Sequence, residues 1–218
     1  MFFFALKELA KGKSIHKILI NFCIQGYKLH GRVIDFGGGK KMIWSHFRYL
    51  KKEEGMELQT VDIDKNNNPD FIVNLENEKL SVLDSSFIMA LAFNVLEHIY
   101  NVKNLLSESY RVLSPGGEFL GSVPFLLRVH PDPNDYFRYT KDALEKLMKE
   151  AGFSEVKIKT AGLGPFTAGY LQIEPFMPKI LRMIIFSFSF LADKLILRLK
   201  PQIKEYYPLG YVWIAKKL

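Results

Sequence analysis

The segment Val33–Lys40 constrains the fold more than any other part of this 218-residue chain. Residues typical of a buried strand, Val33–Phe36, run directly into three glycines, and a helix-like stretch is expected from Met42 to Lys52. Glycine lets the backbone come within contact distance of a bound molecule because it has no Cβ. In an α/β sheet such a turn lies at the carboxyl end of a strand, where ligands bind. The segment therefore predicts an α/β fold with a ligand site at this turn.

Three kinds of ligand use a glycine turn of this sort. A dinucleotide site requires G-x-G-x-x-G, but Met42 stands where the third glycine belongs. A P-loop requires glycine at 34 and Ser or Thr at 41, where the chain has Ile34 and Lys41. A nucleoside without a bridging phosphate needs the turn and a carboxylate for its ribose, and Asp62 follows Gly39 by 23 residues, close to the spacing of such an acid. The sequence favours a nucleoside; the alternative is a plain turn beside a surface acid.

Alternating strand and helix patterns predict a doubly wound, mostly parallel seven-stranded sheet. Phe87–Phe93 is continuously apolar, as expected of a parallel strand covered on both faces. Asn101 and Thr140 are predicted to cap the helices that follow them. The predicted strands cover residues 32–36, 58–62, 70–73, 87–93, 118–123, 156–160 and 211–215.

Length and composition indicate a single domain over residues 1–218, with a leading helical segment (1–30) and a helical insert or cap (165–207). The single cysteine, Cys23, excludes an internal disulfide framework and fits a reducing, cytoplasmic location. No Cys/His cluster has zinc spacing, so no metal site is expected. The longest apolar run, Met183–Ala192, has ten residues, too few for a spanning helix. Neither a signal peptide nor a transmembrane segment is expected.

The net charge of +7 is concentrated at two flanks: residues 1–32 carry +5 and residues 176–200 carry +4. The rest of the chain, which holds the glycine turn, is slightly acidic, and this argues against nucleic acid as a partner. Within 176–200, apolar residues at helical spacing alternate with five basic ones, which predicts a basic amphipathic helix before the last strand. Such a helix binds a membrane interface; the alternatives are a cap over the active site and a dimer contact.

Several motifs in order along the chain resemble class I S-adenosylmethionine (SAM) methyltransferases. They are Asp35–Gly39 (D-x-G-x-G), the strand-ending Asp62, Leu96–Ile99, Arg111–Gly117 and Glu150–Phe153. The likeness covers about residues 30–160 and a closing strand near the C-terminus. Residues 130–140 also resemble a subgroup associated with the synthesis of cell-surface polysaccharides or lipid-linked sugars.

The resemblance implies SAM as the cofactor and a set of residues that hold it. Asp35 and the glycines would shape the pocket for the methionine end, Asp62 would accept hydrogen bonds from the ribose, and Asn94 would line the methionine side. Asn74 stands where the family usually has an acid for the adenine amine; it would accept the same bond or is simply a turn residue. The full set is Asp35, Gly37, Gly38, Gly39, Asp62, Ile63, Asn74, Leu75 and Asn94.

Two histidines are candidate bases for removing a proton from a hydroxyl acceptor, because histidine titrates near neutral pH. His98 follows the fourth predicted strand and is also explained as a structural part of its motif. His130 lies in a proline-rich loop with three candidate acceptor-binding residues, Asp135, Tyr136 and Arg138. The alternative for this loop is a self-stabilised turn in which Asp135 and Arg138 pair with each other.

The sequence therefore predicts a SAM-dependent methyltransferase that acts on oxygen of a small or lipid-linked, glycosidic acceptor. The rival hypothesis is a methyltransferase-fold binding module that has lost catalysis, which departures from the family at Asn74 and Ile88 leave open. A nucleic-acid methyltransferase is not supported, because Asn94 does not begin an N-P-P-Y type tetrapeptide.

Overall fold

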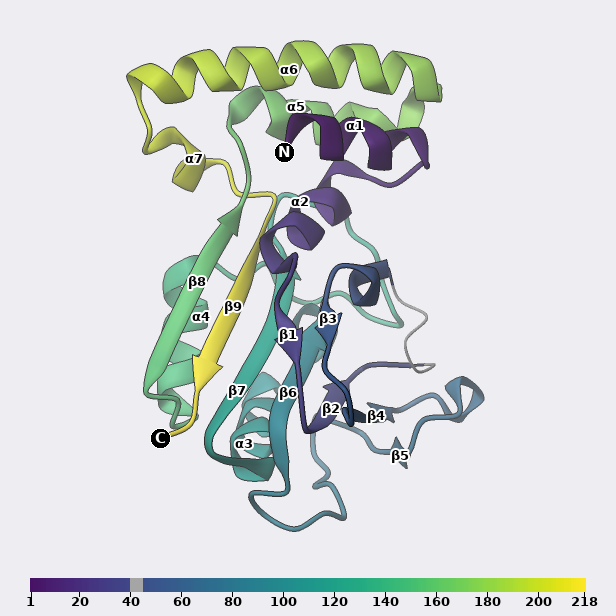
Figure 1. The fold of residues 1–218 in the computed structure, drawn as a ribbon, viewed down its shortest axis with the longest axis vertical. Helices are drawn as coiled ribbons and strands as arrows, with labels where there is room; N and C mark the ends of the chain where they lie inside the picture. The colour runs from purple at the N-terminus through teal and green to yellow at the C-terminus, as the bar shows by residue number, and fades with distance from the viewer. Residues whose placement is uncertain (40–44) are drawn as a thin grey trace. The chain divides into compact units, whose positions relative to one another are not determined.

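The computed structural model describes residues 1–39 and 45–218. Its main sheet has seven strands in the order β5-β4-β2-β6-β7-β9-β8 (Figure 1). The strands are β2 (Arg32–Phe36), β4 (Glu57–Asp62), β5 (Phe71–Ile72), β6 (Phe87–Phe93), β7 (Leu113–Pro124), β8 (Glu155–Ala161) and β9 (Gly210–Lys216). The registers of β2 with β4 and β6, of β4 with β5 and of β6 with β7 are all parallel. The predicted α/β sheet is confirmed.

Helices and short turns connect the strands. The α-helices are α1 (Phe2–Ala10), α2 (Ile15–Ile24), α3 (Val102–Val112), α4 (Lys141–Glu150), α5 (Pro165–Ile173), α6 (Lys179–Leu199) and α7 (Ile203–Tyr206). The 3-10 turns are η1 (Ser45–Arg48), η2 (Lys65–Asn67), η3 (Leu96–His98) and η4 (Glu174–Phe176), and β1 (Lys28–Leu29) pairs with β3 (Lys51–Lys52) in a small second sheet.

The strand order reverses between β2 and β6. The chain runs outward from β2 to β4 and β5, then returns to place β6 on the other side of β2. At such a reversal the connections leave in opposite directions and open a crevice at the carboxyl ends of the strands. The glycine turn after β2 and the segment after β6 therefore lie next to each other at this edge of the sheet.

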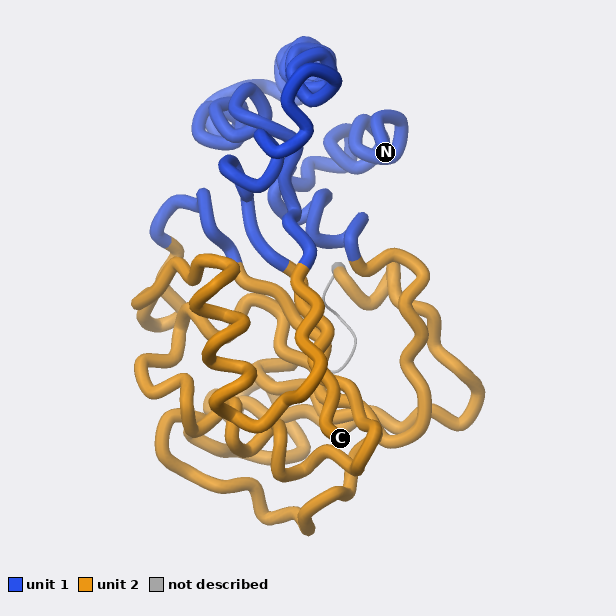
Figure 2. The backbone as a smooth tube through the Cα atoms, turned by 90° about the vertical axis from the view of Figure 1, so that its left-hand side faces the viewer, with its two compact units in different colours: residues 1–23, 124–129, 159–211 blue, residues 24–123, 130–158, 212–218 orange. Residues whose placement is uncertain are grey.

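The chain divides into two compact units (Figure 2). Unit 2 (residues 24–123, 130–158 and 212–218) contains most of the sheet, and unit 1 (1–23, 124–129 and 159–211) contains α1, α5, α6 and α7. The single domain expected over 1–218 stays a prediction. Among the described residues, no helix combines the length and apolar character needed to cross a membrane.

The core of unit 2 is built on strands that are apolar on both faces. Phe119 of β7 lies 5.6 Å from the rings of both Phe153 and Trp213, and the Trp213 side chain is fully buried. Gly121 leaves the space that this indole fills: a Cβ there would lie 2.2 Å from the ring and 2.2 Å from the Ala92 carbonyl oxygen. The close approach of β6, β7 and β9 therefore depends on a glycine.

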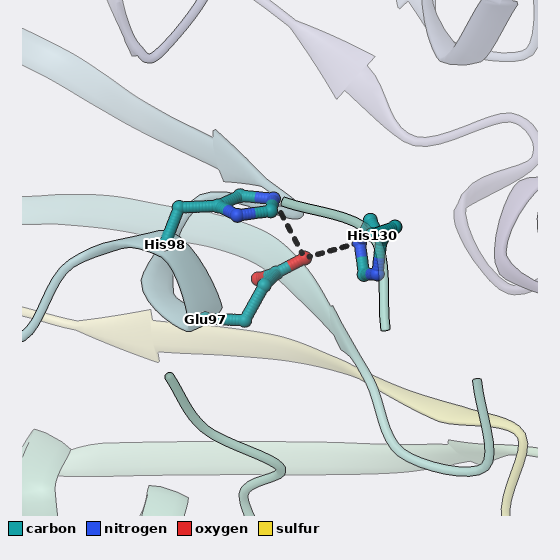
Figure 3. A group of neighbouring side chains, drawn as sticks. All are labelled: Glu97, His98 and His130. Carbon is teal, nitrogen blue, oxygen red and sulfur yellow. Dashed lines mark ion pairs between the residues drawn. The ribbon is translucent and has the colours of Figure 1, made fainter. Parts of the chain in front are cut away.

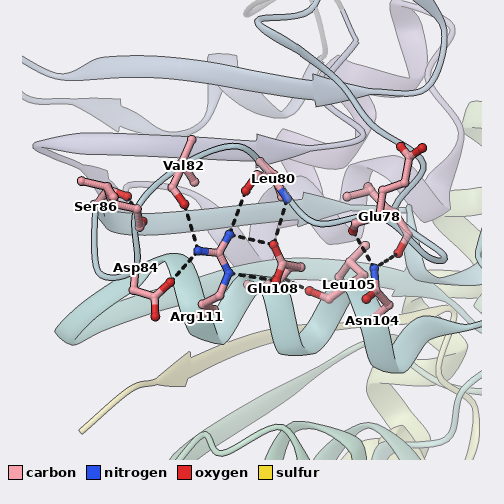
Figure 4. A network of polar contacts seen from close by, with 12 residues as sticks. Glu78, Leu80, Val82, Asp84, Ser86, Asn104, Leu105, Glu108 and Arg111 are labelled. Atoms are coloured by element: carbon pink, nitrogen blue, oxygen red, sulfur yellow. Dashed lines mark hydrogen bonds and ion pairs between the residues drawn. The ribbon is translucent and has the colours of Figure 1, made fainter.

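A network of polar contacts fixes the segment before β6 onto α3 (Figure 4). Arg111 donates to both carboxylate oxygens of Glu108 at 2.8–2.9 Å, to Asp84 at 2.6 Å, and to the carbonyl oxygens of Leu80 and Val82. Glu108 is 2% exposed, and Arg111 holds its pKa below the usual value despite burial. The guanidinium thus satisfies a buried carboxylate and the carbonyls of a segment that has no regular structure.

Unit 1 packs through aromatic rings and two buried acids. Phe2 of α1 stacks on Phe186 of α6 at 6.2 Å. Asp193 of α6 accepts hydrogen bonds from the amides of Phe166 and Thr167, in the first turn of α5. Glu174 accepts from the amide of Ile15 at 3.0 Å, at the start of α2. Both carboxylates satisfy amides that a helix N-terminus leaves without an internal partner.

Two local predictions are wrong. The expected helix from Met42 to Lys52 is replaced, in its described part, by the single turn η1 and strand β3, because Lys51 and Glu53 donate to carbonyls of Tyr27 and Leu29 instead of closing helical turns. Asn101 stands at the N-cap of α3, but its side chain donates to the Glu76 carbonyl and does not cap.

The other predicted cap is confirmed, since the Thr140 hydroxyl accepts from the amide of Ala143 at 3.2 Å.

Candidate functional site

The glycine turn after β2 has the backbone that only glycine adopts easily. Gly37 and Gly39 have φ of 67° and 52°, in the left-handed region. A Cβ on Gly37 would lie 2.6 Å from Cγ2 of Val95, so the turn and the segment after β6 are in direct contact. The next residues, including Lys41, lie outside the described part of the chain. The predicted cofactor residues Gly37, Gly38 and Gly39 therefore form one turn at the reversal of strand order.

Asp35 points its carboxylate into the base of this turn. The side chain is 2% exposed, and its Oδ2 has no hydrogen-bond partner among the described residues. A Cβ on Gly38 would lie 2.6 Å from that oxygen, so residue 38 must be small. Burial, with a smaller effect of Asp62, raises the pKa of Asp35 from 3.8 to about 7. Asp35 is thus a buried acid that a cationic ligand group would stabilise in its charged form.

Asp62 ends β4 at the same edge of the sheet. Its Oδ1 accepts from the amide of Asp64 at 2.8 Å, and its Oδ2 accepts from the side-chain amide of Asn67 at 3.1 Å. These bonds hold the carboxylate in one orientation and leave further acceptor positions on both oxygens. The neighbouring Ile63 is 61% exposed. The role of both residues in holding the cofactor stays a prediction.

Asn74 and Leu75, after β5, are less clearly placed for adenine. The Asn74 side-chain oxygen accepts from the amide of Glu76 at 3.0 Å, which is the local turn that the alternative interpretation described. Leu75 is buried. After β6, Asn94 adopts a left-handed φ of 54°, and its side-chain oxygen accepts from the Ser122 hydroxyl at 3.0 Å. The side-chain oxygen of Asn74 is therefore already engaged in a local turn, and the Asn94 side chain is held by Ser122 at the carboxyl end of β6.

Glu97, His98 and His130 form a cluster just beyond β6 (Figure 3). Nε2 of His98 lies 3.7 Å from Oε1 of Glu97, and Nε2 of His130 lies 3.6 Å from the same oxygen. The two imidazole rings are 5.1 Å apart at 80°. The structure thus brings together the two predicted bases, which are 32 residues apart in sequence.

The loop that carries His130 is held by an ion pair between Asp135 and Arg138. The guanidinium donates to Oδ1 at 2.5 Å and to Oδ2 at 2.7 Å, and it holds the pKa of Asp135 well below its usual range. Asp135 also accepts from the backbone amide of His130 at 2.8 Å. Tyr136 is 43% exposed and lies edge-on to Tyr100 at 5.4 Å. The local pairing of Asp135 and Arg138, one of the two interpretations of this loop, is present.

Two features of the site were not predicted from sequence. Glu97 is fully buried and central to the cluster, although a charged residue between Leu96 and His98 inside an apolar motif was a signal that could have shown it. His46 stacks on Phe93 of β6 at 4.2 Å, and burial lowers its pKa to about 3. His46 is therefore neutral at physiological pH.

Comparison with known proteins decides the family. A model of the methyltransferase domain matches residues 10–158, more than half of the chain. The chain belongs to the methyltransferase-domain family. This membership confirms the resemblance to SAM-dependent methyltransferases that the sequence motifs carried. The match runs across the glycine turn, Asp62 and the Glu97–His98–His130 cluster, so the whole candidate site lies within the family's own domain.

One relative and two solved structures illustrate the likeness. A Mycolicibacterium smegmatis protein named "Probable S-adenosylmethionine-dependent methyltransferase" is 32% identical over 81 residues, which are 34% of this chain and 32% of the relative. Phosphoethanolamine N-methyltransferase 2 of Haemonchus contortus, in complex with SAM, superposes with a TM-score of 0.52 and 18% identity over 90% of this chain and 52% of that one. A SAM-dependent methyltransferase of Thermotoga maritima superposes with a TM-score of 0.55 and 16% identity, over 100% of this chain and 91% of that one.

These comparisons differ in what they cover. The aligned part spans about a third of the M. smegmatis relative, and the chain spans about half of the H. contortus enzyme. At such low identity the structural matches show the fold alone, and that fold is the expected Rossmann-like one.

Proposed function

We propose that this protein is a SAM-dependent methyltransferase that transfers a methyl group to an oxygen atom of its acceptor. The observation that carries the proposal is the position of three groups at one edge of the sheet in unit 2. The glycine turn follows β2, Asp62 ends the adjacent β4, and the histidine cluster follows β6 on the other side of β2. Neighbouring strands thereby supply the groups that would bind a nucleoside cofactor and the groups that would accept a proton.

The proposed cofactor contacts follow from the chemistry of SAM. Its ribose would donate to Asp62, whose oxygens have acceptor capacity left. Its methionine end, which carries an ammonium group, would lie at the glycine turn beside the buried carboxylate of Asp35. Gly37, Gly38 and Gly39 would allow close approach of the backbone. Asn94, Ile63, Asn74 and Leu75 complete the proposed set.

The methyl transfer needs alignment more than new charge stabilisation. An acceptor oxygen attacks the methyl carbon, a C–O bond forms, the C–S bond breaks, and its electron pair neutralises the sulfonium. Holding the two reactants in line contributes several kcal/mol. The acceptor hydroxyl also loses a proton, and His98 and His130 are the groups proposed to take it. Both rings lie 3.6–3.7 Å from the Glu97 carboxylate.

The proposed acceptor is small or lipid-linked and carries a sugar. Support comes from the aromatic side chains beside the cluster: Tyr136 and Tyr100 are exposed by 43% and 65%, and their rings contact each other. Such rings offer an apolar face with a hydroxyl at its edge, which suits a polar, ring-shaped ligand. Because Arg138 and Asp135 pair with each other, they are proposed to shape this loop and to meet the acceptor at their remaining donor and acceptor positions.

A membrane contact through α6 is proposed as the route to a lipid-linked acceptor. Large apolar side chains of α6 remain exposed at helical spacing, namely Ile180, Leu181, Ile184, Phe188, Leu191, Leu195 and Leu199. The inner face of the helix is marked by buried Phe186 and Asp193. Basic residues at both ends of the helix fit an anionic lipid surface.

Liposome flotation tests this contact. Binding to anionic vesicles that is lost in Phe188→Glu would support it, with Lys146→Glu on α4 as the matched control for an added negative charge. Absence of binding to both neutral and anionic vesicles would refute the membrane contact and leave the cap and the dimer contact.

The rival is a methyltransferase-fold module without catalysis. The glycine turn, Asp62 and the paired histidines are all present, which favours the enzyme. The two functions differ in one outcome: the module binds SAM and transfers no methyl group to any acceptor.

Calorimetric titration with SAM and S-adenosylhomocysteine tests the proposal first. We expect binding by the wild-type protein and at least a tenfold loss in Asp62→Ala, with the exposed Asp142→Ala of α4 unchanged. Screening of glycosidic and lipid-linked hydroxyl acceptors with labelled SAM follows. Turnover that survives in His98→Ala and His130→Ala alike would refute the assigned base, and failure of the wild type to bind SAM would refute the function itself.

A further inference from the structure

The Glu97 carboxylate lies in surroundings that are incomplete. The side chain is 0% exposed, and both of its oxygens lack a hydrogen-bond partner among the described residues. Removing a carboxylate from water is costly unless it is paired or binds a cation. Two imidazoles lie beside it, and at 3.6 and 3.7 Å their nitrogens are beyond hydrogen-bond distance. The buried carboxylate therefore lacks a hydrogen-bond partner among the described residues, although the Arg138 guanidinium interacts with it electrostatically.

The contacts of the two rings show which of their nitrogens lie toward the Glu97 carboxylate. Nδ1 of His98 lies 2.6 Å from the carbonyl oxygen of Asn134, and because a carbonyl only accepts, this nitrogen carries the proton. Nδ1 of His130 lies 3.4 Å from the carboxylate of Asp135. In the neutral ring of His98, Nε2 is then an acceptor. Nδ1 of His130 also lies 3.5 Å from the guanidinium of Arg138, which only donates, so the contacts of this ring do not fix its tautomer. Both Nε2 atoms lie on the side of Oε1 of Glu97 (Figure 3).

We propose that Glu97, His98 and His130 bind a divalent transition-metal ion, with zinc as the closest fit. Two imidazole nitrogens and one carboxylate are a common ligand set for catalytic zinc, which keeps a further position open. Ligand atoms at ~2.1 Å from a tetrahedral ion lie about 3.4 Å from one another. The three ligand atoms here all lie within 4.8 Å of one another, with 3.6 and 3.7 Å between the carboxylate and the nitrogens. Small side-chain rotations would close the site.

The surroundings of the cluster match those of a metal centre. Histidines that bind metals usually donate their other N–H to a carbonyl or carboxylate, which fixes the ring and its tautomer. His98 has the Asn134 carbonyl in this role. Nδ1 of His130 lies 3.4 Å from the Asp135 carboxylate and 3.5 Å from the Arg138 guanidinium, and Asp135 is itself held by two bonds from Arg138. One loop thus supplies a ligand and the outer partners of both rings. Because the ligands are split between residues 97–98 and 130, the sequence shows no zinc spacing.

The consequence for catalysis rests on the proposed function. An acceptor hydroxyl in the open position of the ion would have a lowered pKa and would release its proton to water. The resulting alkoxide would attack the methyl carbon of SAM, with the C–S electron pair passing to sulfur as before. The two histidines would then act on the acceptor through the ion instead of removing the proton directly. The rival arrangement has no metal and two protonated rings around Glu97.

Metal titration distinguishes these arrangements. The whole protein, freed of metal with a chelator and returned to chelator-free buffer, is titrated with ZnCl₂ by calorimetry, and Co²⁺ is added separately to record its visible absorption. We expect one ion per chain, and cobalt bands typical of four- or five-coordination. Glu97→Gln, which keeps the side-chain volume, and His130→Ala are each expected to weaken zinc binding at least 100-fold. Asp135→Asn is expected to weaken it about 10- to 100-fold.

His30→Ala is the matched control, since His30 lies outside the cluster in the same unit, and it should bind zinc as the wild type does. Absence of stoichiometric binding, or binding unchanged in both Glu97→Gln and His130→Ala, overturns the inference in favour of protonated rings. SAM titration of the same samples separates the two proposals. A wild-type protein that binds SAM and no metal ion refutes only the metal site, and a wild-type protein that binds the metal ion and no SAM refutes only the proposed cofactor function.

Discussion

Replacement of Asp35 by asparagine should stabilise the protein and impair its cofactor binding. The carboxylate is 2% exposed, and its pKa rises from 3.8 to about 7 on folding. Between about pH 4 and pH 7 the Asp35 carboxyl is therefore protonated in the folded state and ionised in the unfolded state. The contribution of the protonated Asp35 carboxyl to the free energy of unfolding is fully present below pH 4 and is lost as the pH rises to about 7. At ~1.4 kcal/mol per pKa unit, ionised Asp35 reduces the free energy of unfolding by about 4 kcal/mol at pH 8.

Asparagine has the shape of the neutral acid and does not ionise. We expect Asp35→Asn to match the wild type near pH 4.5 and to exceed it by a margin that grows to about 4 kcal/mol at pH 8, an upper value because buried charges relax their surroundings. Urea unfolding at several pH values measures this, with the exposed Asp142→Asn as control. A variant that is less stable than the wild type at pH 8 would show that the carboxylate has a stabilising partner, and the reasoning would fail.

The same variant should bind SAM more weakly, because the proposed role of Asp35 is to face the cationic methionine end. Binding to the wild type should release a proton near pH 6–7, so affinity should fall as the pH drops below about 7. Calorimetry in two buffers of different ionisation enthalpy measures the released proton. Stability that rises while binding falls is typical of functional residues. Equal SAM affinity in the variant and the wild type would remove Asp35 from the site.

Four further substitutions test the scaffold. Burial raises the pKa of Glu174 from 4.5 to about 7, so the stabilising contribution of the protonated carboxyl is lost as the pH rises between those values. Glu174→Gln should therefore be about 3 kcal/mol more stable than the wild type at pH 8 and equal to it at pH 4.5. Urea unfolding at the two pH values measures this. Gly121→Ala should lose about 3 kcal/mol or more by placing a Cβ against an indole ring, whereas Gly169→Ala in α5, with open space, should gain up to about 1 kcal/mol; melting curves compare the two. Arg111→Ala should lose about 3–5 kcal/mol because it leaves Glu108 buried without its partner, and chemical unfolding at pH 7 checks this.

The strands were predictable where their pattern is local. Arg32–Phe36 and Phe87–Phe93 have the expected bounds. Phe87–Phe93 is an uninterrupted apolar run, as expected of a strand covered on both faces, and Arg32–Phe36 runs directly into the glycine turn that ends it. The helix expected over Met42–Lys52 failed for the opposite reason. There the backbone of Lys51 and Glu53 bonds to residues more than 20 positions earlier, and no local pattern reveals such a partner.

The candidate site shows the same contrast. The glycine turn and Asp35 were found because their chemistry is contained in five consecutive residues. The Glu97 cluster was not, since it depends on how the loop after β7 returns to the end of β6. That return is fixed by the Asp135–Arg138 pair and by the bond between His98 and Asn134, which are contacts of the folded chain only.

Two unsatisfied carboxylates mark this edge of the sheet. Among the described residues, the buried acid oxygens without a hydrogen-bond partner belong to Asp35 and Glu97. One lies at the end of β2 and the other just past the end of the adjacent β6, on the two sides of the point where strand order reverses. Buried charges of this kind reduce stability, and they persist where a ligand supplies the missing partner. The SAM ammonium proposed at Asp35 and the divalent ion proposed at Glu97 would be separate partners, so their effects on the melting temperature should be independent and additive. A metal-induced rise that disappears in Glu97→Gln while the SAM-induced rise remains would assign one ligand to each acid.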